Sequence, residues 1–413
     1  MSKLQELINK LCPNGVEFKP LGEVFEMRNG YTPSKNNPEF WEGGTIPWFR
    51  MDDIRENGRI LSDSIQHITP SAIKGKGLFE ANSFILATTA TIGEHAMIIA
   101  DSLANQRFTN LSVRKSLSNL LVTKFIYYYM FIVDDFCKRN TNVSGFASVD
   151  MDKLKKMPFP VPPIEVQEEI VRILDSFSDY AAELQAELQA RKQQYEYYRN
   201  LLLTFNPSAY GCGTDDEQKD GVTTWGGHNY KIQWKKLGEI CDNMDKLRKP
   251  VTASTRISGI YPYYGASGVV DHVNNYIFDG SYLLISEDGA NLLARSTPIA
   301  FSIYGKTWVN NHAHVLHFNS DVTRKFVEYF INNLDISKYV SGGAQPKLNQ
   351  KKLNSILIPI PPLELQEKIV AILDRFETLV NDLTNGLPAE IAAVKDQYEY
   401  YRNKLLTFKK LSV

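Results

Sequence analysis

Apolar residues recur every third or fourth position in two long stretches, residues 164–203 and 363–406. The first stretch contains no Gly or Pro, and its apolar steps alternate between four and three. This is the heptad pattern of a helix that packs along its length against a partner helix. The second stretch repeats the pattern with four extra residues, and Asn385-Gly386-Leu387-Pro388 at that point predicts a kink or an interruption.

Each of these two predicted helices is the expected antiparallel partner of the other, which would place a domain at either end of the pair. The residues expected to line the helix–helix seam are Ile170, Leu174, Phe177, Leu184, Leu188, Tyr195, Tyr198, Ile369, Leu373, Phe376, Val380, Leu383, Tyr398 and Tyr401. Val166, Val171, Ile173, Val370 and Ile372 fall outside the strict seam. They leave apolar surface either for another protein or for the chain's own domains.

The chain is a tandem duplication, because similar segments follow one another in the same order in both halves. The pairs are FKPLGEV (18–24) with WKKLGEI (234–240), DKLKKMPFPVPP (152–163) with KKLNSILIPIPP (351–362), PPIEVQEEIVRILDSF (162–177) with PPLELQEKIVAILDRF (361–376), and YEYYRNLLLTF (195–205) with YEYYRNKLLTF (398–408). Between these matches the two halves have little in common, as expected of two domains that recognise different targets.

The repeats set the domain boundaries. We expect a first globular domain at 1–160, a helical region at 161–205, a linker at 206–230, a second globular domain at 231–360 and a second helical region at 361–413. The linker is rich in Gly, Asp, Thr and Lys, which is typical of an exposed segment. Each domain combines short strand-like runs with one helix near its end, so the fold class is α+β. The expected strands are 83–87, 97–99, 282–285, 298–301 and 313–316, and the expected helices 123–137 and 322–334.

Charge is distributed unevenly although the chain of 413 residues has a formal net charge of only −1. The two helical stretches sum to −7, which leaves +6 for the remainder. Acidic helices repel a phosphate backbone, whereas mildly basic domains tolerate one. The start of the chain shows no cationic segment before an apolar run, and no stretch is apolar enough to span a membrane, so we expect a cytoplasmic protein. The widely spaced Cys12, Cys137, Cys212 and Cys241 are expected to be free thiols.

Motifs for catalysis are missing from the sequence. No GxxxxGK[ST] phosphate loop, no Asn/Asp-Pro-Pro-aromatic tetrad and no pair of acids with a nearby Lys on an adjacent strand is present. His312, His314 and His317 do not share one face of a strand and have no Cys or carboxylate beside them in sequence, so no metal site is expected. Any chemistry that the protein serves should therefore lie on other chains.

Basic and amide side chains among turn-forming residues are the candidates for DNA contact, since Arg and Lys bind guanine or phosphate and Asn and Gln pair with adenine. Those of the first domain are Lys35, Asn36, Arg50, Lys74, Lys76, Thr89, Thr91 and Arg107. Those of the second are Lys246, Arg248, Lys249, Tyr264, Ser267, Asn291, Arg295, Lys306, Asn310, Asn311, Gln345 and Lys347.

The duplicated PPIEVQEEIVRILD and YEYYRN segments, with IPWFRMDDI, ATTATIGEHAMI, YPYYGASGVVD, YIFDGSYLLISEDGANLL and GGAQPKLNQKKL, resemble type I restriction–modification specificity (S) subunits. The resemblance covers nearly the whole chain. It implies two target-recognition domains that each bind one half of a bipartite site in double-stranded DNA. It also implies helices that set the spacing of the half-sites and dock two methyltransferase subunits, with two restriction subunits as further possible partners.

Under this resemblance the cofactors S-adenosylmethionine, ATP and Mg belong to the partner subunits, and none binds this chain directly. One departure is SGFASVD at 144–150, where the second half has GGAQPKLN and hence Gln345 and Lys347. Two other classes of function stay open on the sequence. They are a coiled-coil scaffold whose domains bind proteins or sugars, and a self-contained nuclease or methyltransferase.

Overall fold

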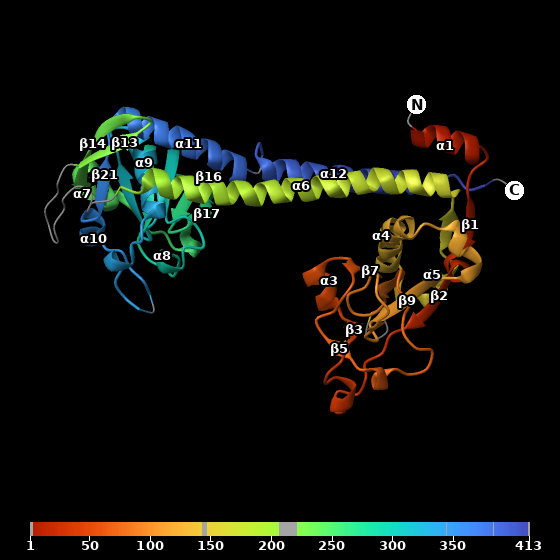
Figure 1. The fold of residues 1–413 in the computed structure, drawn as a ribbon. Coiled ribbons are helices and arrows are strands. Elements are labelled where there is room, and N and C mark those ends of the chain that lie inside the picture. The colour runs from red at the N-terminus through yellow and green to blue at the C-terminus, as the bar shows by residue number, and fades with distance from the viewer. Residues whose placement is uncertain (1–2, 143–146, 206–220, 344, 383, 412–413) are drawn as a thin grey trace. The chain divides into compact units, whose positions relative to one another are not determined.

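The computed structural model describes residues 3–142, 147–205, 221–343, 345–382 and 384–411. The chain divides into two compact units, one formed by residues 1–184 with 391–413 and the other by residues 185–390. Each unit therefore contains one globular domain and one section of each helical stretch (Figure 1).

The first domain is built on a five-stranded sheet in the order β2-β9-β6-β7-β4, beside a three-stranded sheet in the order β5-β3-β8. Its strands are β1 (Glu17–Pro20), β2 (Phe25–Asn29), β3 (Ile46–Phe49), β4 (Ile60–Leu61), β5 (His67–Ile68), β6 (Ser83–Ala87), β7 (His95–Ile98), β8 (Leu103–Ala104), β9 (Phe108–Val113), β10 (Thr141–Asn142), β11 (Ser148–Val149) and β12 (Pro158–Val161). Its helices are α1 (Lys3–Leu11), α2 (Leu21–Val24), α3 (Met51–Asn57), α4 (Thr123–Arg139) and α5 (Met151–Lys156).

Alternate side chains along the strands of this sheet pack into two different hydrophobic cores. Phe84 and Leu86 of β6 pack in a core with α4, whereas Ile85 and Ala87 pack in a second core with the smaller sheet. Successive side chains of a strand point to opposite faces, so both faces of the sheet are covered. The expected strand at 83–87 and the expected helix at 123–137 are confirmed as β6 and α4.

The second domain repeats this frame with a six-stranded sheet in the order β15-β20-β18-β19-β16-β17. The strands are β13 (Gly221–Trp225), β14 (His228–Lys236), β15 (Asp242–Asn243), β16 (Ser258–Gly265), β17 (Gly268–Val273), β18 (Phe278–Ser286), β19 (Ala300–Val309), β20 (Ala313–His317) and β21 (Leu357–Ile360). The helices are α7 (Leu237–Ile240), α8 (Asn291–Ala294), α9 (Asp321–Asn333) and α10 (Gln350–Asn354). The strands expected at 282–285, 298–301 and 313–316 lie within or overlap β18, β19 and β20.

Residues 206–220 lie outside the described part of the chain. The last part of the segment expected to be a linker is not one, because β13 pairs antiparallel with β14 from Gly221↔Ile232 to Trp225↔His228. The β-favouring residues Val222, Thr223, Thr224 and Trp225 before the Gly226-Gly227 turn favour such a hairpin. The Gly, Asp and Thr content of the segment concealed the hairpin in the sequence.

The helical stretches form α6 (Ile164–Leu203), α11 (Leu363–Asn381) and α12 (Leu387–Leu405). The interruption expected at Asn385–Pro388 is confirmed, since α11 ends at Asn381. There the Asp382 carboxylate accepts hydrogen bonds from the backbone N–H groups of Thr384 and Asn385, at 2.7 and 3.2 Å. A Cβ on Gly386 would lie 2.4 Å from the Thr378 carbonyl oxygen, so this position requires glycine.

The seam between the helices is antiparallel within each unit. Phe177 stacks on Tyr401 with ring centroids 5.5 Å apart in the first unit, and Tyr195 and Tyr198 meet Phe376 at 6.1 and 5.7 Å in the second. Ile170, Leu174, Leu184, Ile369, Leu373 and Val380 are buried, whereas Tyr198 and Tyr401 are partly exposed at the seam's edge. Leu188 and Tyr398 are half-buried, and Tyr398 also packs on Tyr128 with ring centroids 6.4 Å apart. The last predicted seam residue, Leu383, lies outside the described residues.

The apolar residues outside the seam are covered by the chain itself. Val166 is fully buried in the core of the first domain, with Val171 and Ile173 packed against that core, and Val370 lies in the core of the second. Ile372 is half-buried and outside that core. The domains therefore cover most of this surface.

Each helix is fixed to its own domain by the same set of polar contacts. In the first unit the Tyr128 hydroxyl donates to Asp175 at 2.5 Å, and Lys124 pairs with the same carboxylate at 2.7 Å. In the second unit the Tyr329 hydroxyl lies 2.5 Å from Asp374 and 2.6 Å from Glu377, and these two carboxylates share its single proton. KFIYY (124–128) and KFVEY (325–329) thus form a further repeat inside domains whose sequences appear unrelated.

Candidate nucleic-acid interface

A pocket of about 360 Å³ lies in the first domain where the segments after β2, β3 and β8 meet. It brings together four of the predicted DNA-contact residues, namely Lys35, Arg50, Thr91 and Arg107. The full lining is Thr32, Lys35, Trp48, Arg50, Met51, Asp52, Arg55, Thr91, Asn105, Gln106 and Arg107. With four cations against one acid it is electropositive, as a surface that accepts phosphate should be.

Trp48 and Arg50 give the pocket a fixed shape. The indole N–H of Trp48 donates to the Tyr31 carbonyl at 3.0 Å, and the Arg50 guanidinium lies 6.0 Å from the centroid of the indole ring. The Asp52 carboxylate lies 3.9 Å from the Arg50 guanidinium, and the buried Nε of Arg50 has no hydrogen-bond partner among the described residues. Lys35, Arg55 and Arg107 form no ion pair within the described part of the chain. These cations are free to meet an anion.

Tyr31 connects this pocket to the loop that carries two further candidates, Lys74 and Lys76. Its hydroxyl accepts from the Lys74 backbone N–H at 2.8 Å and donates to the Ala72 carbonyl at 3.0 Å. Lys74 and Lys76 line a second cavity of about 300 Å³ together with Arg28 and Tyr31. The two cavities are therefore joined through one short segment of chain.

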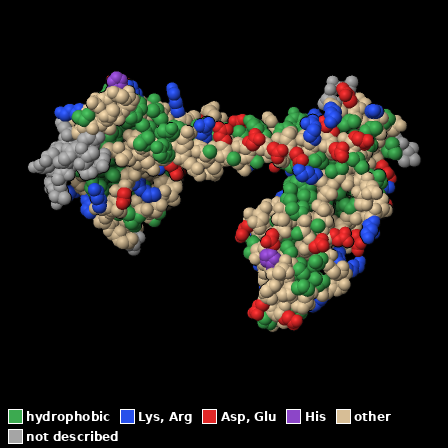
Figure 2. Space-filling view, in the orientation of Figure 1, with side chains coloured by type: hydrophobic (Ala, Val, Ile, Leu, Met, Phe, Trp, Pro, Cys, Tyr) green, Lys and Arg blue, Asp and Glu red, His purple; other side chains and the backbone are tan. Residues whose placement is uncertain are grey.

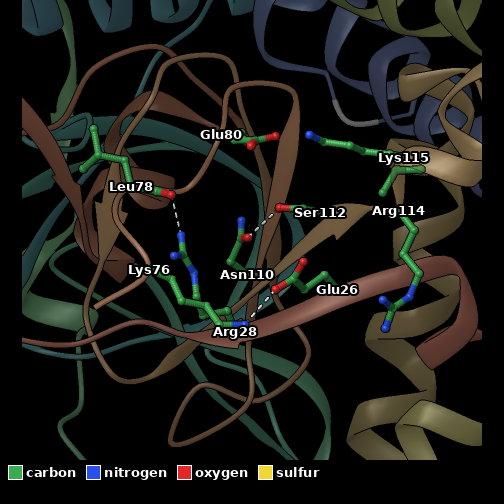
Figure 3. Close-up of a pocket in the computed structure, with 10 residues that line it drawn as sticks. Glu26, Arg28, Lys76, Leu78, Glu80, Asn110, Ser112, Arg114 and Lys115 are labelled. Carbon is green, nitrogen blue, oxygen red and sulfur yellow. Dashed lines mark hydrogen bonds and ion pairs between the residues drawn. The ribbon is translucent and has the colours of Figure 1, made fainter. Parts of the chain in front are cut away.

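A polar groove of about 200 Å³ continues from there along β2 and β9 (Figure 3). Glu26 and Arg28 of β2 face Ser112 and Asn110 of β9 in direct register. Lys76 pairs with Glu26 at 3.0 Å and lowers the pKa of that carboxyl through its hydrogen bond and its charge. Arg114 and Lys115 lie at the other end of the groove, and both are exposed.

Two candidates of the first domain do not line these cavities. Asn36 is exposed beside Lys35. Thr89 forms an isolated bridge with Ser148. It precedes Ala90, which has a positive φ of 66° that is unfavourable for a residue with a side chain. Such strain persists only where the surroundings impose it.

In the second domain most of the candidates lie on five loops that hydrogen bonds tie together. The Asn310 N–H donates to the Tyr264 carbonyl at 3.0 Å, and the Lys249 N–H donates to the Val309 carbonyl at 3.4 Å. The Gly289 N–H donates to the carbonyl of Pro346 at 3.1 Å. The candidates on these loops, or on the strand and helix ends that flank them, are Lys246, Arg248, Lys249, Tyr264, Ser267, Asn291, Asn310, Asn311, Gln345 and Lys347.

An ion-pair network lies beneath these loops. Arg248 pairs with Glu287 at 2.6 Å and with Asp245 at 3.3 Å, and Lys347 reaches the other oxygen of Glu287 at 3.1 Å. His314 places Nδ1 2.6 Å from Asp245 and Nε2 2.7 Å from the Leu348 carbonyl oxygen. Burial would raise the pKa of Asp245 and of Glu287, but the neighbouring His314 and Arg248 outweigh it and lower both.

Asp245, Glu287 and His314 are close enough to ligate a metal ion. However, the Arg248 guanidinium contacts both carboxylates, so a side chain already supplies the positive charge. His312 pairs separately with Asp288 at 2.9 Å, and His317 lies 3.8 Å from Asp242. The three histidines thus form three different contacts.

Some candidates of the second domain have structural partners instead. Arg295 adopts a left-handed conformation after α8, and its guanidinium donates to the carbonyls of Leu334 and Ile331 near the end of α9. Asn310 is buried, and Asn291 bonds within its own turn. Lys306 lies 4.7 Å from the ring centroid of Tyr276. Sequence position alone did not reveal these partners.

Acidic and basic side chains are intermixed along the surface of α6 and α12 (Figure 2).

Within the described residues, no helix has both the length and the apolar character that crossing a bilayer requires.

Comparison with known proteins agrees with this arrangement. The family described as "Type I restriction modification DNA specificity domain" matches residues 13–191 and 230–393. The specificity subunit of type I restriction enzyme EcoprrI from Escherichia coli is 40% identical over 406 residues, covering 96% of this chain and 94% of the relative. The EcoR124I/EcoR124II specificity subunit, also from Escherichia coli, is 29% identical over 447 residues, 99% of this chain and 98% of its own length.

Solved structures share the fold. The HsdS subunit from Thermoanaerobacter tengcongensis aligns with a TM-score of 0.55 at 17% identity, covering 96% of this chain and 97% of its own. A chain from a study of complex assembly and conformational transition of the type I restriction–modification system aligns with a TM-score of 0.60 at 17% identity, covering 95% and 98%.

Two divergent domains on one duplicated frame, each joined to a section of a helical pair, define a two-domain DNA-recognition protein. The chain belongs to the type I restriction–modification specificity subunits. It is thus the non-catalytic subunit that gives such a complex its DNA sequence specificity, as the resemblance implied.

Proposed function

We propose that the first domain reads its half-site with the pocket around Trp48 and holds the DNA backbone with the groove along β2. The observation that carries this is the cluster of unpaired cations, since Lys35, Arg55 and Arg107 surround the pocket without an ion pair in the described residues. Free cations release counterions when they bind phosphate, whereas ion-paired ones contribute less. The second domain reads the other half-site with its five tied loops.

Binding of the complex to matched and scrambled duplexes at two salt concentrations tests this proposal. We expect tight binding to the matched duplex only. Higher salt should weaken binding to both duplexes, and the preference for the matched duplex should persist. Equal affinity for the two duplexes would contradict sequence recognition. Replacing residues 231–360 with the corresponding domain of a relative should change one half of the methylated motif and leave the other intact.

We further propose that the outer faces of the helices dock two methyltransferase subunits, and that restriction subunits join the same complex. The repeated YEYYRN segment supports this. Tyr197 is 63% exposed and its repeat Tyr400 is 60% exposed. Each packs edge-to-face on the next tyrosine with centroids 5.3 Å apart. Exposed tyrosines are typical anchors of protein interfaces, and two copies of one surface suit two copies of one partner.

Co-purification tests the docking proposal. Tyr197→Ala and Tyr400→Ala should each halve the number of methyltransferase subunits retained per chain, and the double variant should retain none. Val222→Ala, which truncates an exposed residue of β13, serves as the control. Unchanged retention in the double variant would contradict the proposal.

S-adenosylmethionine, ATP and Mg are assigned to the partner subunits under this proposal, and the complex is assigned to the cytoplasm, where the host DNA lies. Calorimetric titration of the isolated chain with each cofactor should give no heat of binding, and the assembled complex should bind S-adenosylmethionine.

A further inference from the structure

The same hydrogen-bonded turn occurs in both domains, at the residues that precede β9 and β20. In the first domain the turn is Asn105-Gln106-Arg107, and in the second it is Asn310-Asn311-His312. The side-chain oxygen of the first residue accepts from the N–H of the third, at 3.0 Å from Asn105 to Arg107 and at 2.8 Å from Asn310 to His312. Asn favours this local turn because its side chain bonds to the backbone two residues on.

Two backbone hydrogen bonds fix the turn in the same way in both places. The N–H of the first residue donates to the neighbouring strand, from Asn105 to Phe49 at 3.0 Å and from Asn310 to Tyr264 at 3.0 Å. The carbonyl of the third residue accepts from the residue that follows the central strand. In the first domain the Thr88 N–H donates to Arg107 at 3.0 Å, and in the second the Glu287 N–H donates to His312 at 2.8 Å.

These equivalent contacts connect equivalent strands. β9 and β20 both pair antiparallel with the central strands β6 and β18. β3 and β16 both run parallel to the strand that enters the turn, with Trp48↔Leu103 in one domain and Tyr263↔Trp308 in the other. The turn is thus a conserved part of the duplicated frame, although NQR and NNH share only one residue.

At the tip of each turn stands an exposed amide, Gln106 in one domain and Asn311 in the other. Gln106 is oriented, because the Thr32 hydroxyl donates to its side-chain oxygen. That oxygen retains its second lone pair, and the amide NH₂ stays free to donate. Gln and Asn are the side chains that pair with both N6 and N7 of adenine in the major groove.

We propose that this turn is the base-reading element of both domains, and that Gln106 and Asn311 each specify one A·T pair, in different half-sites. This proposal rests on the proposed function and assigns residues to it. The base that a partner methylates leaves the stack during the reaction, so the A·T pairs read here are other pairs of each half-site. Arg107 and His312 stand next to the amides. Arg107 is unpaired within the described residues, whereas Asp288 holds His312.

Methylome sequencing of a host that expresses the whole complex tests the proposal, with Gln106→Ala, Asn311→Ala and the double variant. We expect Gln106→Ala to make one A·T position of one half degenerate, and Asn311→Ala to do the same in the other half. Competition binding should show a fall of roughly 5- to 150-fold in discrimination at that pair, the range for loss of one bidentate contact. Both side chains are exposed, so neither change should affect folding.

Two control variants separate the possible outcomes. Val222→Ala, on an exposed position of β13, should leave the motif intact. Thr32→Val keeps the Gln106 amide but removes the group that orients it, and should weaken discrimination at the same position only. An unchanged motif in both variants, or a change of the same half by both, would overturn the proposal. Absence of any sequence preference in the wild-type complex would instead overturn the proposed function.

Discussion

The two target-recognition domains share a backbone frame but differ in how their cations are neutralised. Around Trp48 in the first domain, Lys35 and Arg55 have no acidic partner within the described residues. In the second domain Arg248 and Lys347 are held by Glu287. The first domain thus keeps charge available for phosphate, and the second uses charge to hold five loops in place. Duplication has preserved the geometry of recognition while the charges have diverged.

Removal of Arg248 should have the largest effect on stability. Arg248→Ala would leave Asp245 and Glu287 largely buried without their main counterion, and breaking a buried ion pair costs about 3–5 kcal/mol. Arg50→Ala in the first domain should cost less than about 1 kcal/mol, because the Arg50–Asp52 pair is longer and more exposed. Hydrogen exchange at β18 and β20, compared with β6 and β9, measures each domain separately. Equal losses of stability from Arg248→Ala and Arg50→Ala would contradict the difference in ion pairing between the two domains.

The tyrosines that fix each helix to its domain offer the next comparison. Tyr329→Phe removes the one hydroxyl proton that lies between two carboxylates, Asp374 and Glu377, whereas Tyr128→Phe removes a proton shared with Asp175 alone. Hydrogen bonds to charged groups contribute about 1.5–3 kcal/mol, so we expect a loss of about 2 kcal/mol for Tyr329→Phe and a smaller one for Tyr128→Phe. Urea denaturation followed by near-ultraviolet circular dichroism measures both. A larger loss of stability for Tyr128→Phe than for Tyr329→Phe would contradict a stabilising role of Glu377 as the second partner of Tyr329.

The sequence predicted the long helices, their seam and their interruption, because heptad spacing and a Gly-Leu-Pro segment act locally. It also predicted strands such as β6, whose five residues are all buried. It placed Lys35, Arg50, Thr91 and Arg107 among the DNA contacts, and the structure brings them to one pocket.

What the sequence could not supply depends on tertiary partners. In the sequence Arg295 looks like a free cation, and only the fold places the end of α9 beside it. Arg248 likewise looks free, and only the fold places Glu287 beside it. Gln106 was missed because its neighbours in sequence give no sign of the pocket. The repeat of its turn as NNH becomes visible only when the strands before and after it are superposed in order.

Single lysines test the charge contrast through binding. Lys35→Ala should weaken binding to every duplex several-fold and reduce the slope of log affinity against log salt by about 0.9, the value of one phosphate contact. Lys347→Ala should change the slope less, because Lys347 already pairs with Glu287 at 3.1 Å. Fluorescence anisotropy at four salt concentrations gives both slopes. Equal slopes for the two variants would show that ion pairing does not withhold Lys347 from DNA.

The smallest expected effect concerns the position where the repeated helices carry opposite charges, Glu169 in α6 and Lys368 in α11. Hydrogen bonds from Arg172, followed by Lys3, lower the pKa of Glu169 to about 2 in spite of its burial. Its usual value is about 4.3, so its contribution to stability is complete above that pH and is lost as the pH falls towards 2. The hydrogen bonds that Lys368 donates to Glu364 and to the Tyr230 hydroxyl raise the pKa of Lys368. The contribution of Lys368 is therefore lost at the alkaline end instead.

Glu169→Gln should therefore cost about 1 kcal/mol at neutral pH, since its partners Lys3 and Arg172 are exposed and screened. The cost should shrink as the pH falls below about 4 and vanish near pH 2. Lys368→Met should instead matter at neutral pH and lose its effect only as the pH rises past the ordinary lysine value of about 10.4. Thermal unfolding from pH 2 to 11 measures both, with the wild type as reference. If the Glu169→Gln difference were independent of pH, Glu169 would act by packing α1 against α6 and not by its charge, and the opposite pH responses of the two repeats would disappear.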